Sequence, residues 1–154
     1  SPGRGIVEYR RAPCGFSELL VSGTAEQAPR RLKSWLFAEA GRDLDQRVQV
    51  HARTLKLNPK RIAVRDQTSR WGSCSTTGLL SFSWRLVLAP PFILDYVAAH
   101  EVAHLKHMNH GPAFWRTVAT LLDGLPLEFR DREVDWASAR EWLRRRGAAL
   151  HSYG

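Results

Sequence analysis

His100-Glu101-Val102-Ala103-His104 is the stretch of this chain that decides the fold of its central part and the chemistry built on it. It lies in an apolar pattern that predicts a helix over about residues 92–108. Positions i and i+4 lie on one face of a helix, so His100 and His104 offer two imidazole nitrogens to one metal ion. Glu101 flanks the open side of that ion, where it can act on a bound water. The stretch therefore predicts a zinc hydrolase.

The third metal ligand is left open between two kinds of residue. His110 lies just past the predicted helix, where Gly111-Pro112 can turn the chain back over the ion, and we prefer it. Its spacing from His100 is that of the metzincin motif, but His107 replaces the glycine of that motif and no methionine follows Met108. A metzincin is therefore disfavoured, and His107 is interpreted as a neighbouring or surface residue. The alternative, as in gluzincins, is a downstream carboxylate: Glu128, Asp131 or Glu133.

Three protein ligands leave the fourth position of a zinc ion for water, as a catalytic site requires. Zinc lowers the pKa of bound water from about 16 to about 7, so hydroxide is available at neutral pH. Glu101 is predicted to take the proton as water attacks a carbonyl or phosphoryl centre, and to return it to the leaving group. A purely structural zinc site has no need of Glu101, which argues against a non-catalytic binding module.

The composition is that of an ordinary folded protein. Of 154 residues, 44% are hydrophobic and 25% are charged, a length and balance that favour one domain over residues 1–154. The net charge of +8 and pI near 10.3 are interpreted first as a solvated basic surface. A nucleotide or nucleic acid is the alternative partner that this charge suggests. The positive residues cluster at 30–33 and 140–146.

Cysteine content and hydropathy bear on the compartment. Cys14 and Cys74 are too few for a disulfide framework, which favours a reducing, cytoplasmic setting. The longest apolar stretch, at residues 86–94, is broken by Pro90 and Pro91, and no signal peptide is recognised. We expect no membrane partner, and the oligomeric state stays open.

The pattern of elements predicts an α+β fold. Alternation and turn residues predict strands, and longer apolar periodicity predicts helices. The expected segments are N-terminal strands in 1–23, a long helix over 24–58 that Gly41 can divide, a sheet in 61–85, metal-site helices in 91–123 and a C-terminal helix over 129–147. The strands expected in the sheet are 62–65, 70–73 and 79–84.

Several short motifs occur in a fixed order. They are Arg70-Trp71-Gly72-Ser73-Cys74-Ser75, Trp84-Arg85-Leu86, Asp95-Tyr96-Val97, His100 to Leu105, Asn109-His110-Gly111 and Phe114-Trp115. As a set they resemble the YgjP-like family of bacterial metal-dependent hydrolases, which is related to the SprT-like and WLM zinc metallopeptidases. The resemblance is close over about residues 62–115. One departure is Ser83, where relatives often carry asparagine. This puts in doubt a hydrogen bond to the substrate or to a residue behind the metal ligands, but not the metal site itself.

The resemblance implies a minimal zincin-like fold with a long N-terminal helix, a small antiparallel sheet and an active-site helix. It implies Zn2+ as the cofactor, held by His100, His104 and His110, with Glu101 catalytic. These assignments agree with the spacing of the four residues and strengthen His110 as the third ligand.

Other polar residues near the motif have two interpretations each. Arg85 and Arg70 are possible substrate or transition-state contacts, but a structural salt bridge from Arg85 to Asp95 or another acid is the alternative. Tyr96 can donate a hydrogen bond at the site or simply pack in the helix. Cys74 is interpreted as a small buried residue in preference to a nucleophile.

Four functions compete for this pattern. The leading hypothesis is a zinc-dependent metallopeptidase acting on a peptide or protein, with the predicted strand at 79–83 pairing with an extended peptide. The second is hydrolysis of a nucleotide phosphoanhydride, in which Arg85 or Arg70 handles phosphate charge. The third is a DNA-associated protease like the SprT-like relatives. The fourth is the non-catalytic binding module, which Glu101 disfavours.

Overall fold

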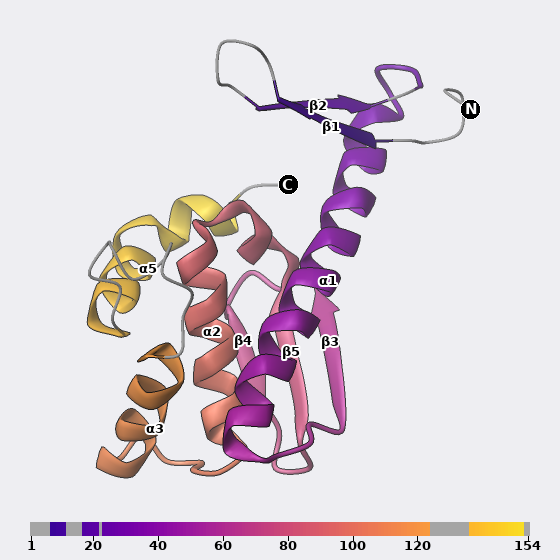
Figure 1. The fold of residues 1–154 in the computed structure, drawn as a ribbon. Coiled ribbons are helices and arrows are strands. Elements are labelled where there is room, and N and C mark those ends of the chain that lie inside the picture. The colour runs from indigo at the N-terminus through magenta and orange to yellow at the C-terminus, as the bar shows by residue number, and fades with distance from the viewer. Residues whose placement is uncertain (1–6, 12–16, 22, 124–135, 153–154) are drawn as a thin grey trace. The chain divides into compact units, whose positions relative to one another are not determined.

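The computed structural model describes residues 7–11, 17–21, 23–123 and 136–152 of a chain that divides into two compact units, 1–39 and 40–153 (Figure 1). In the first unit, strand β1 (Val7–Arg11) pairs antiparallel with β2 (Ser17–Val21), and helix α1 (Ala28–Leu55) begins. The predicted pair of N-terminal strands is confirmed. A single domain over the whole chain stays a prediction.

The part of α1 in the second unit turns an apolar face into the core. Four residues that recur every fourth position are at most 1% exposed: Ala40, Leu44, Val48 and Ala52. Gly41 does not divide the helix, because burial of this face outweighs the cost of about 1 kcal/mol for a helical glycine. Lys56 takes a left-handed conformation (φ 56°) and the Leu57 amide donates to the Ala52 carbonyl, which ends the helix three residues before the predicted 58.

The sheet of the second unit is mixed, and not wholly antiparallel as expected. Strands β3 (Arg61–Arg65), β4 (Gly72–Cys74) and β5 (Leu79–Ser83) are ordered β3-β5-β4, with β3 parallel and β4 antiparallel to β5. The central position of β5 follows from its sequence, because four of its five residues are buried. The expectation that residues 79–83 form an edge for a peptide is therefore wrong.

The helices that carry the site follow the sheet. After the short 3-10 helix η1 (Trp84–Leu88), α2 (Pro91–His104) packs against β4 and α3 (Pro112–Asp123). Helix α5 (Trp136–His151) packs against α2 as well. Helix α2 stops at His104 and not at 108, because the Leu105 amide donates to the Val102 carbonyl and starts a tight turn.

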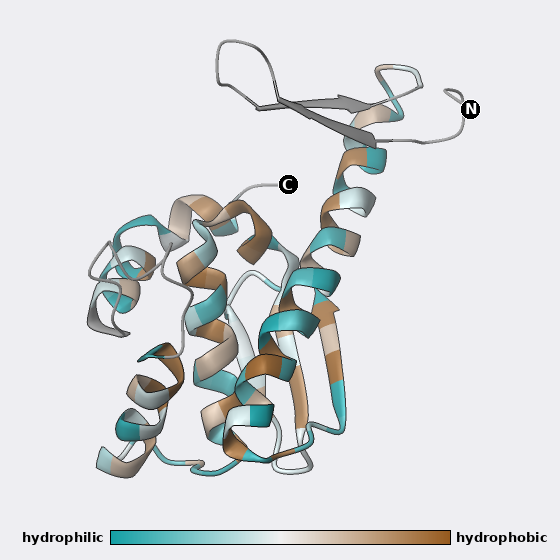
Figure 2. Cartoon of the chain, in the orientation of Figure 1, coloured by the Kyte–Doolittle hydropathy of each residue, from teal (hydrophilic) through white to brown (hydrophobic). Residues whose placement is uncertain are grey.

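The core of the second unit lies between the sheet and these helices. Figure 2 shows hydrophobic residues along β3 and β5 and in bands on α1 and α2. The largest side chains that are almost fully buried include Trp84, Phe82, Phe114 and Leu44. The arrangement is α+β and matches the expected minimal zincin-like fold. Within the described part of the chain, no helix has both the length and the apolar character needed to cross a membrane.

Candidate metal centre

Three histidines converge at the C-terminal end of α2. His100 and His104 lie one turn apart on the helix, and His110 lies in the segment that turns back toward α3. One ring nitrogen from each lies within 4.8 Å of the others, and the Nε2 atoms of His104 and His110 are 2.9 Å apart. The structure thus brings together the three residues predicted as ligands.

The three imidazoles fit a zinc ion. Tetrahedral zinc holds histidine nitrogens at about 2.0–2.1 Å, so two ligand nitrogens lie about 3.3 Å apart. The Nε2 atoms of His104 and His110, 2.9 Å apart, lie close to that value. All three nitrogens lie within 4.8 Å of one another, so small side-chain movements would place them around one ion. Imidazole donors suit zinc and neighbouring transition metals, and three of them leave a fourth position open.

Hydrogen bonds at Nδ1 decide which ring nitrogens could bind a metal ion. His104 Nδ1 donates to the backbone carbonyl of His107 at 3.0 Å, so its Nε2 carries the lone pair. His100 Nδ1 donates to Glu101 Oε2 at 3.1 Å, with the same consequence. Burial is the largest effect on the pKa of His104 and lowers it, which favours the neutral form that binds metal. The backbone carbonyl of His107, which accepts the hydrogen bond from His104 Nδ1, thus helps to orient the His104 ring.

Aromatic side chains of α3 close the far side of the histidines. Phe114 is fully buried and stacks on the His104 ring, with ring centroids 4.4 Å apart. Trp115 lies 5.8 Å from the ring of His110 and 5.9 Å from that of His100. This apolar backing limits ring motion and keeps water from one side of the ligand set.

Gly72 of the neighbouring strand leaves room for the side chain of Glu101. Glu101 is only 5% exposed, yet its carboxylate lines a cavity. A Cβ added at Gly72 would lie 2.9 Å from Glu101 Cγ, 3.0 Å from its Oε2 and 3.0 Å from Val97 Cγ1. A side chain at position 72 would displace the carboxylate. Gly72 lies in the motif at residues 70–75, but no local pattern connects it with Glu101.

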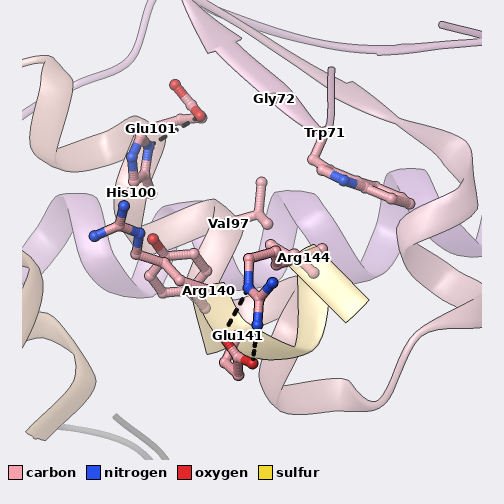
Figure 3. Close-up of a pocket in the computed structure, with 10 residues that line it drawn as sticks. Trp71, Gly72, Val97, His100, Glu101, Arg140, Glu141 and Arg144 are labelled. Carbon is pink, nitrogen blue, oxygen red and sulfur yellow. Dashed lines mark hydrogen bonds and ion pairs between the residues drawn. The ribbon is translucent and has the colours of Figure 1, made fainter. Parts of the chain in front are cut away.

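The cavity beside the triad has a volume of about 660 Å³ and is bounded by α2, β4 and α5 (Figure 3). His100 and Glu101 line one side, and Arg140 and Arg144 of α5 line the other. Tyr96 also lines it, and burial raises the pKa of its phenol to about 12, with Arg140 opposing the rise. The phenol is therefore a hydrogen-bond donor at neutral pH. From sequence, Arg140 is recognisable only as part of a basic helix segment.

The contacts of Arg85 favour the structural salt bridge over a substrate contact. Its side chain is 4% exposed, pairs with Asp66 at 2.7 Å and donates to the Gln67 carbonyl at 3.2 Å. It does not line the cavity, because burial and the ion pair hold the guanidinium elsewhere. Arg70 is exposed and does not line the cavity either.

The carboxylate of Asp95, the acid expected as a partner of Arg85, serves a different contact. It accepts a hydrogen bond from His51 Nε2 at 2.9 Å and is ion-paired with Arg47. Asp95 and His51 are each 1% exposed. These contacts join α1 to α2 inside the core. Removing one partner of such a buried charged group strongly destabilises a protein, because the other charge is left without a partner.

The remaining candidates from the sequence are a cysteine nucleophile and an alternative carboxylate ligand for the metal. Burial, followed by the charge of Glu101, raises the pKa of Cys74 to about 11, so its thiolate is scarce at neutral pH. A cysteine nucleophile is therefore disfavoured. The alternative carboxylate ligands, Glu128, Asp131 and Glu133, lie in the segment 124–135, outside the described residues.

Comparison with known proteins gives one family. The model of the YgjP-like metallopeptidase domain matches residues 17–146, which include both walls of the cavity and the three histidines. No curated protein and no solved structure matches the chain.

Proposed function

The chain belongs to the YgjP-like metallopeptidase family, and from that premise we propose that it is a zinc-dependent peptidase with Glu101 as its general base. Family membership supports a metal-dependent hydrolase acting on peptide or protein. The observation that carries the finer proposal is the position of Glu101, a nearly buried carboxylate beside three convergent histidines and open to a cavity. His100, His104 and His110 would hold the ion.

The bound zinc would supply a Lewis acid and a water of lowered pKa. Glu101 would accept the proton of the attacking water and deliver it to the nitrogen of the departing amine. The Tyr96 phenol, protonated at neutral pH, would donate a hydrogen bond to the carbonyl oxygen of the scissile bond. Gly72, which has no side chain, would leave the space that the carboxylate of Glu101 occupies.

The experiment compares zinc-loaded wild type with Glu101→Gln on unfolded protein, peptides and nucleotides. We expect wild type to cleave peptide bonds, chelator to abolish cleavage, and the variant to keep zinc while losing about 10²–10⁴-fold in rate. Retention of full peptidase activity by the variant would show that Glu101 is not the base.

The same panel tests the alternatives. Release of phosphate or pyrophosphate without peptide cleavage would favour nucleotide hydrolysis, although Arg85, one of the residues expected to bind phosphate, is already ion-paired with Asp66. A protease that acts on DNA would show binding to DNA that weakens steeply as salt rises.

A further inference from the structure

The cavity beside the histidines is large enough to hold a side chain of a substrate. Its volume of about 660 Å³ lies within the range of roughly 300–1,000 Å³ for small-molecule sites. It shares His100 and Glu101 with the candidate metal centre, so a side chain bound there belongs to a residue next to the bond that is cleaved. A role for this cavity in substrate choice rests on the proposed peptidase function.

An apolar surface begins directly beside the carboxylate of Glu101. Gly72 contributes no side chain, and a Cβ built on it would lie 3.0 Å from both Glu101 Oε2 and Val97 Cγ1. The carboxylate and this methyl group therefore flank the same space. Val97 is only 3% exposed, so close packing fixes its methyl groups and makes them a rigid floor of the cavity. An apolar group can thus bind next to the general base.

The Trp71 indole forms a second apolar surface, whose position is fixed by α5. Its ring stacks on that of His151 with centroids 3.7 Å apart and planes at 14°. A Cβ added at Gly147 would lie 3.4 Å from two atoms of the same indole, so the helix backbone approaches it closely. The indole is half-buried and lines the cavity. Because these contacts already order the ring, contact with a substrate side chain costs little further conformational entropy.

Leu143 brings a third apolar surface to the same end of the cavity. It lies one helical turn before Gly147, on the face of α5 that approaches Trp71. Its side chain is half-buried and lines the cavity. Figure 3 shows Val97 and Trp71 among the side chains that surround this space. An apolar pocket is therefore built from α2, from α5 and from the residue that precedes β4.

The charged side chains on the α5 side of the cavity have contacts of their own. Glu141 accepts hydrogen bonds from Arg144 Nη2 at 2.6 Å and Nε at 2.9 Å, and from Arg145 Nε at 2.8 Å. The guanidinium carbon of Arg140 lies 5.1 Å from the centre of the Trp115 ring. A charged group of a substrate would compete with these contacts, whereas an apolar side chain needs only to displace water.

We infer that this pocket binds a large apolar side chain, of the size of leucine or phenylalanine, on the substrate residue next to the scissile bond. Burial of apolar surface stabilises a complex roughly in proportion to the area removed from water. An alanine in that place leaves Val97, Trp71 and Leu143 in contact with water, and a glutamate or lysine loses part of the hydration of its charge.

Two series of one cleavable peptide test the preference. In the first, the residue that supplies the scissile carbonyl is leucine, phenylalanine, alanine, glutamate or lysine; in the second, the residue that supplies the scissile nitrogen varies in the same way. In one series, zinc-loaded wild type is expected to cleave the leucine or phenylalanine peptide about ten- to a hundredfold better in kcat/KM than the alanine peptide. That series shows on which side of the bond the pocket lies. Equal cleavage throughout, or a preference for alanine or a charged residue in both series, overturns the proposal.

Substitutions at Leu143 connect the preference with this pocket. Leu143→Trp fills the space and is expected to lose most cleavage of the phenylalanine peptide while still cleaving the alanine peptide. Leu143→Ala is expected to reduce the preference for leucine over alanine several-fold. Leu150→Ala, the same truncation of a half-buried leucine of α5 that does not line the cavity, is the matched control and should match wild type. An unchanged preference in both Leu143 variants, or an equal loss on all peptides, would overturn the proposal.

Binding measurements separate failure of this inference from failure of the proposed function. If wild type cleaves no peptide, the peptidase proposal fails, and the same peptides are then titrated into zinc-loaded Glu101→Gln. Tighter binding of the leucine or phenylalanine peptide than of the alanine peptide, reduced when Leu143→Ala is added, supports the apolar pocket. Equal binding of all the peptides overturns it.

Discussion

The two sides of the candidate metal centre are built in different ways. The closed side consists of His104, the backbone carbonyl of His107 and the buried ring of Phe114, all within one short stretch of sequence. The open side consists of Glu101, for which Gly72 of β4 leaves room, and of Arg140 on α5. The difference suggests that the local segment would hold the metal, while segments distant in the sequence line the cavity beside it.

The largest expected effect comes from the closed side. His104→Ala removes the ligand whose orientation is fixed by a backbone hydrogen bond, so zinc should be lost on dialysis. Metal-ion catalysis contributes several kcal/mol, so hydrolysis should fall on the order of a thousandfold or more. Zinc content by atomic emission and peptide turnover check both. A variant that kept one zinc per chain would show that His104 is not a ligand.

The second prediction compares the free energy of unfolding of one variant behind the histidines with that of one variant beside the cavity. Phe114→Ala removes a fully buried ring and should cost about 3–5 kcal/mol in the free energy of unfolding. Arg144→Gln removes a side chain that is 72% exposed and should cost less than about 1 kcal/mol. Urea unfolding of the zinc-loaded proteins measures both. Equal losses would show that the buried ring of Phe114 stabilises the fold no more than an exposed side chain beside the cavity does.

The third prediction moves the base without touching the ligands. Gly72→Ala places a Cβ 2.9–3.0 Å from Glu101, and a misplacement of about 1 Å can cost roughly a hundredfold in rate. We expect kcat to fall by that factor with zinc content unchanged. Gly41→Ala is the matched control, because its Cβ would meet only Val64 at 3.9 Å. A Gly72→Ala enzyme with wild-type kcat would show that the carboxylate position is not restricted.

The smallest effect concerns the docking of α5. Burial is the largest effect on the pKa of His151 and lowers it, so the unfolded chain binds a proton more readily than the folded one. This contribution to stability is fully present above the unfolded pKa of about 6.5 and is lost as pH falls through the lower folded pKa. Since the ring is partly exposed, the loss should stay below about 1 kcal/mol.

Melting curves of the metal-free protein at pH 7.5 and pH 5 test this effect against His151→Gln. The wild type should lose slightly more stability than the variant on acidification. An identical loss in both proteins would show that His151 does not contribute to the pH dependence.

The closed side could be predicted from sequence because its determinants are local. Helical spacing places His100 and His104 on one face, and Gly111 follows His110 closely enough to turn the chain. The same local pattern predicted that the metal-site helices end at residue 123, where α3 ends. It missed the end of α2, because the turn after His104 depends on backbone hydrogen bonds that no periodicity records.

The open side could not be predicted, because its contacts join segments far apart in the sequence. Nothing in the series Arg140 to Arg146 separates the residue at the cavity from those on the exposed face. The order of the strands was missed for the same reason, since pairing of β3 with β5 depends on tertiary packing. A substrate contact by Arg85, which lies in a recognised motif, is disfavoured because its guanidinium pairs with Asp66, a residue outside every motif.

The most direct measurement is a crystal structure of the zinc-loaded protein with anomalous diffraction at the zinc edge. The predicted result is one ion bound by Nε2 of His100, His104 and His110 at about 2.0–2.1 Å, with a solvent oxygen in the fourth position beside Glu101. A carboxylate from Glu128, Asp131 or Glu133 in place of His110, or a fourth protein ligand that closes the site, would contradict it.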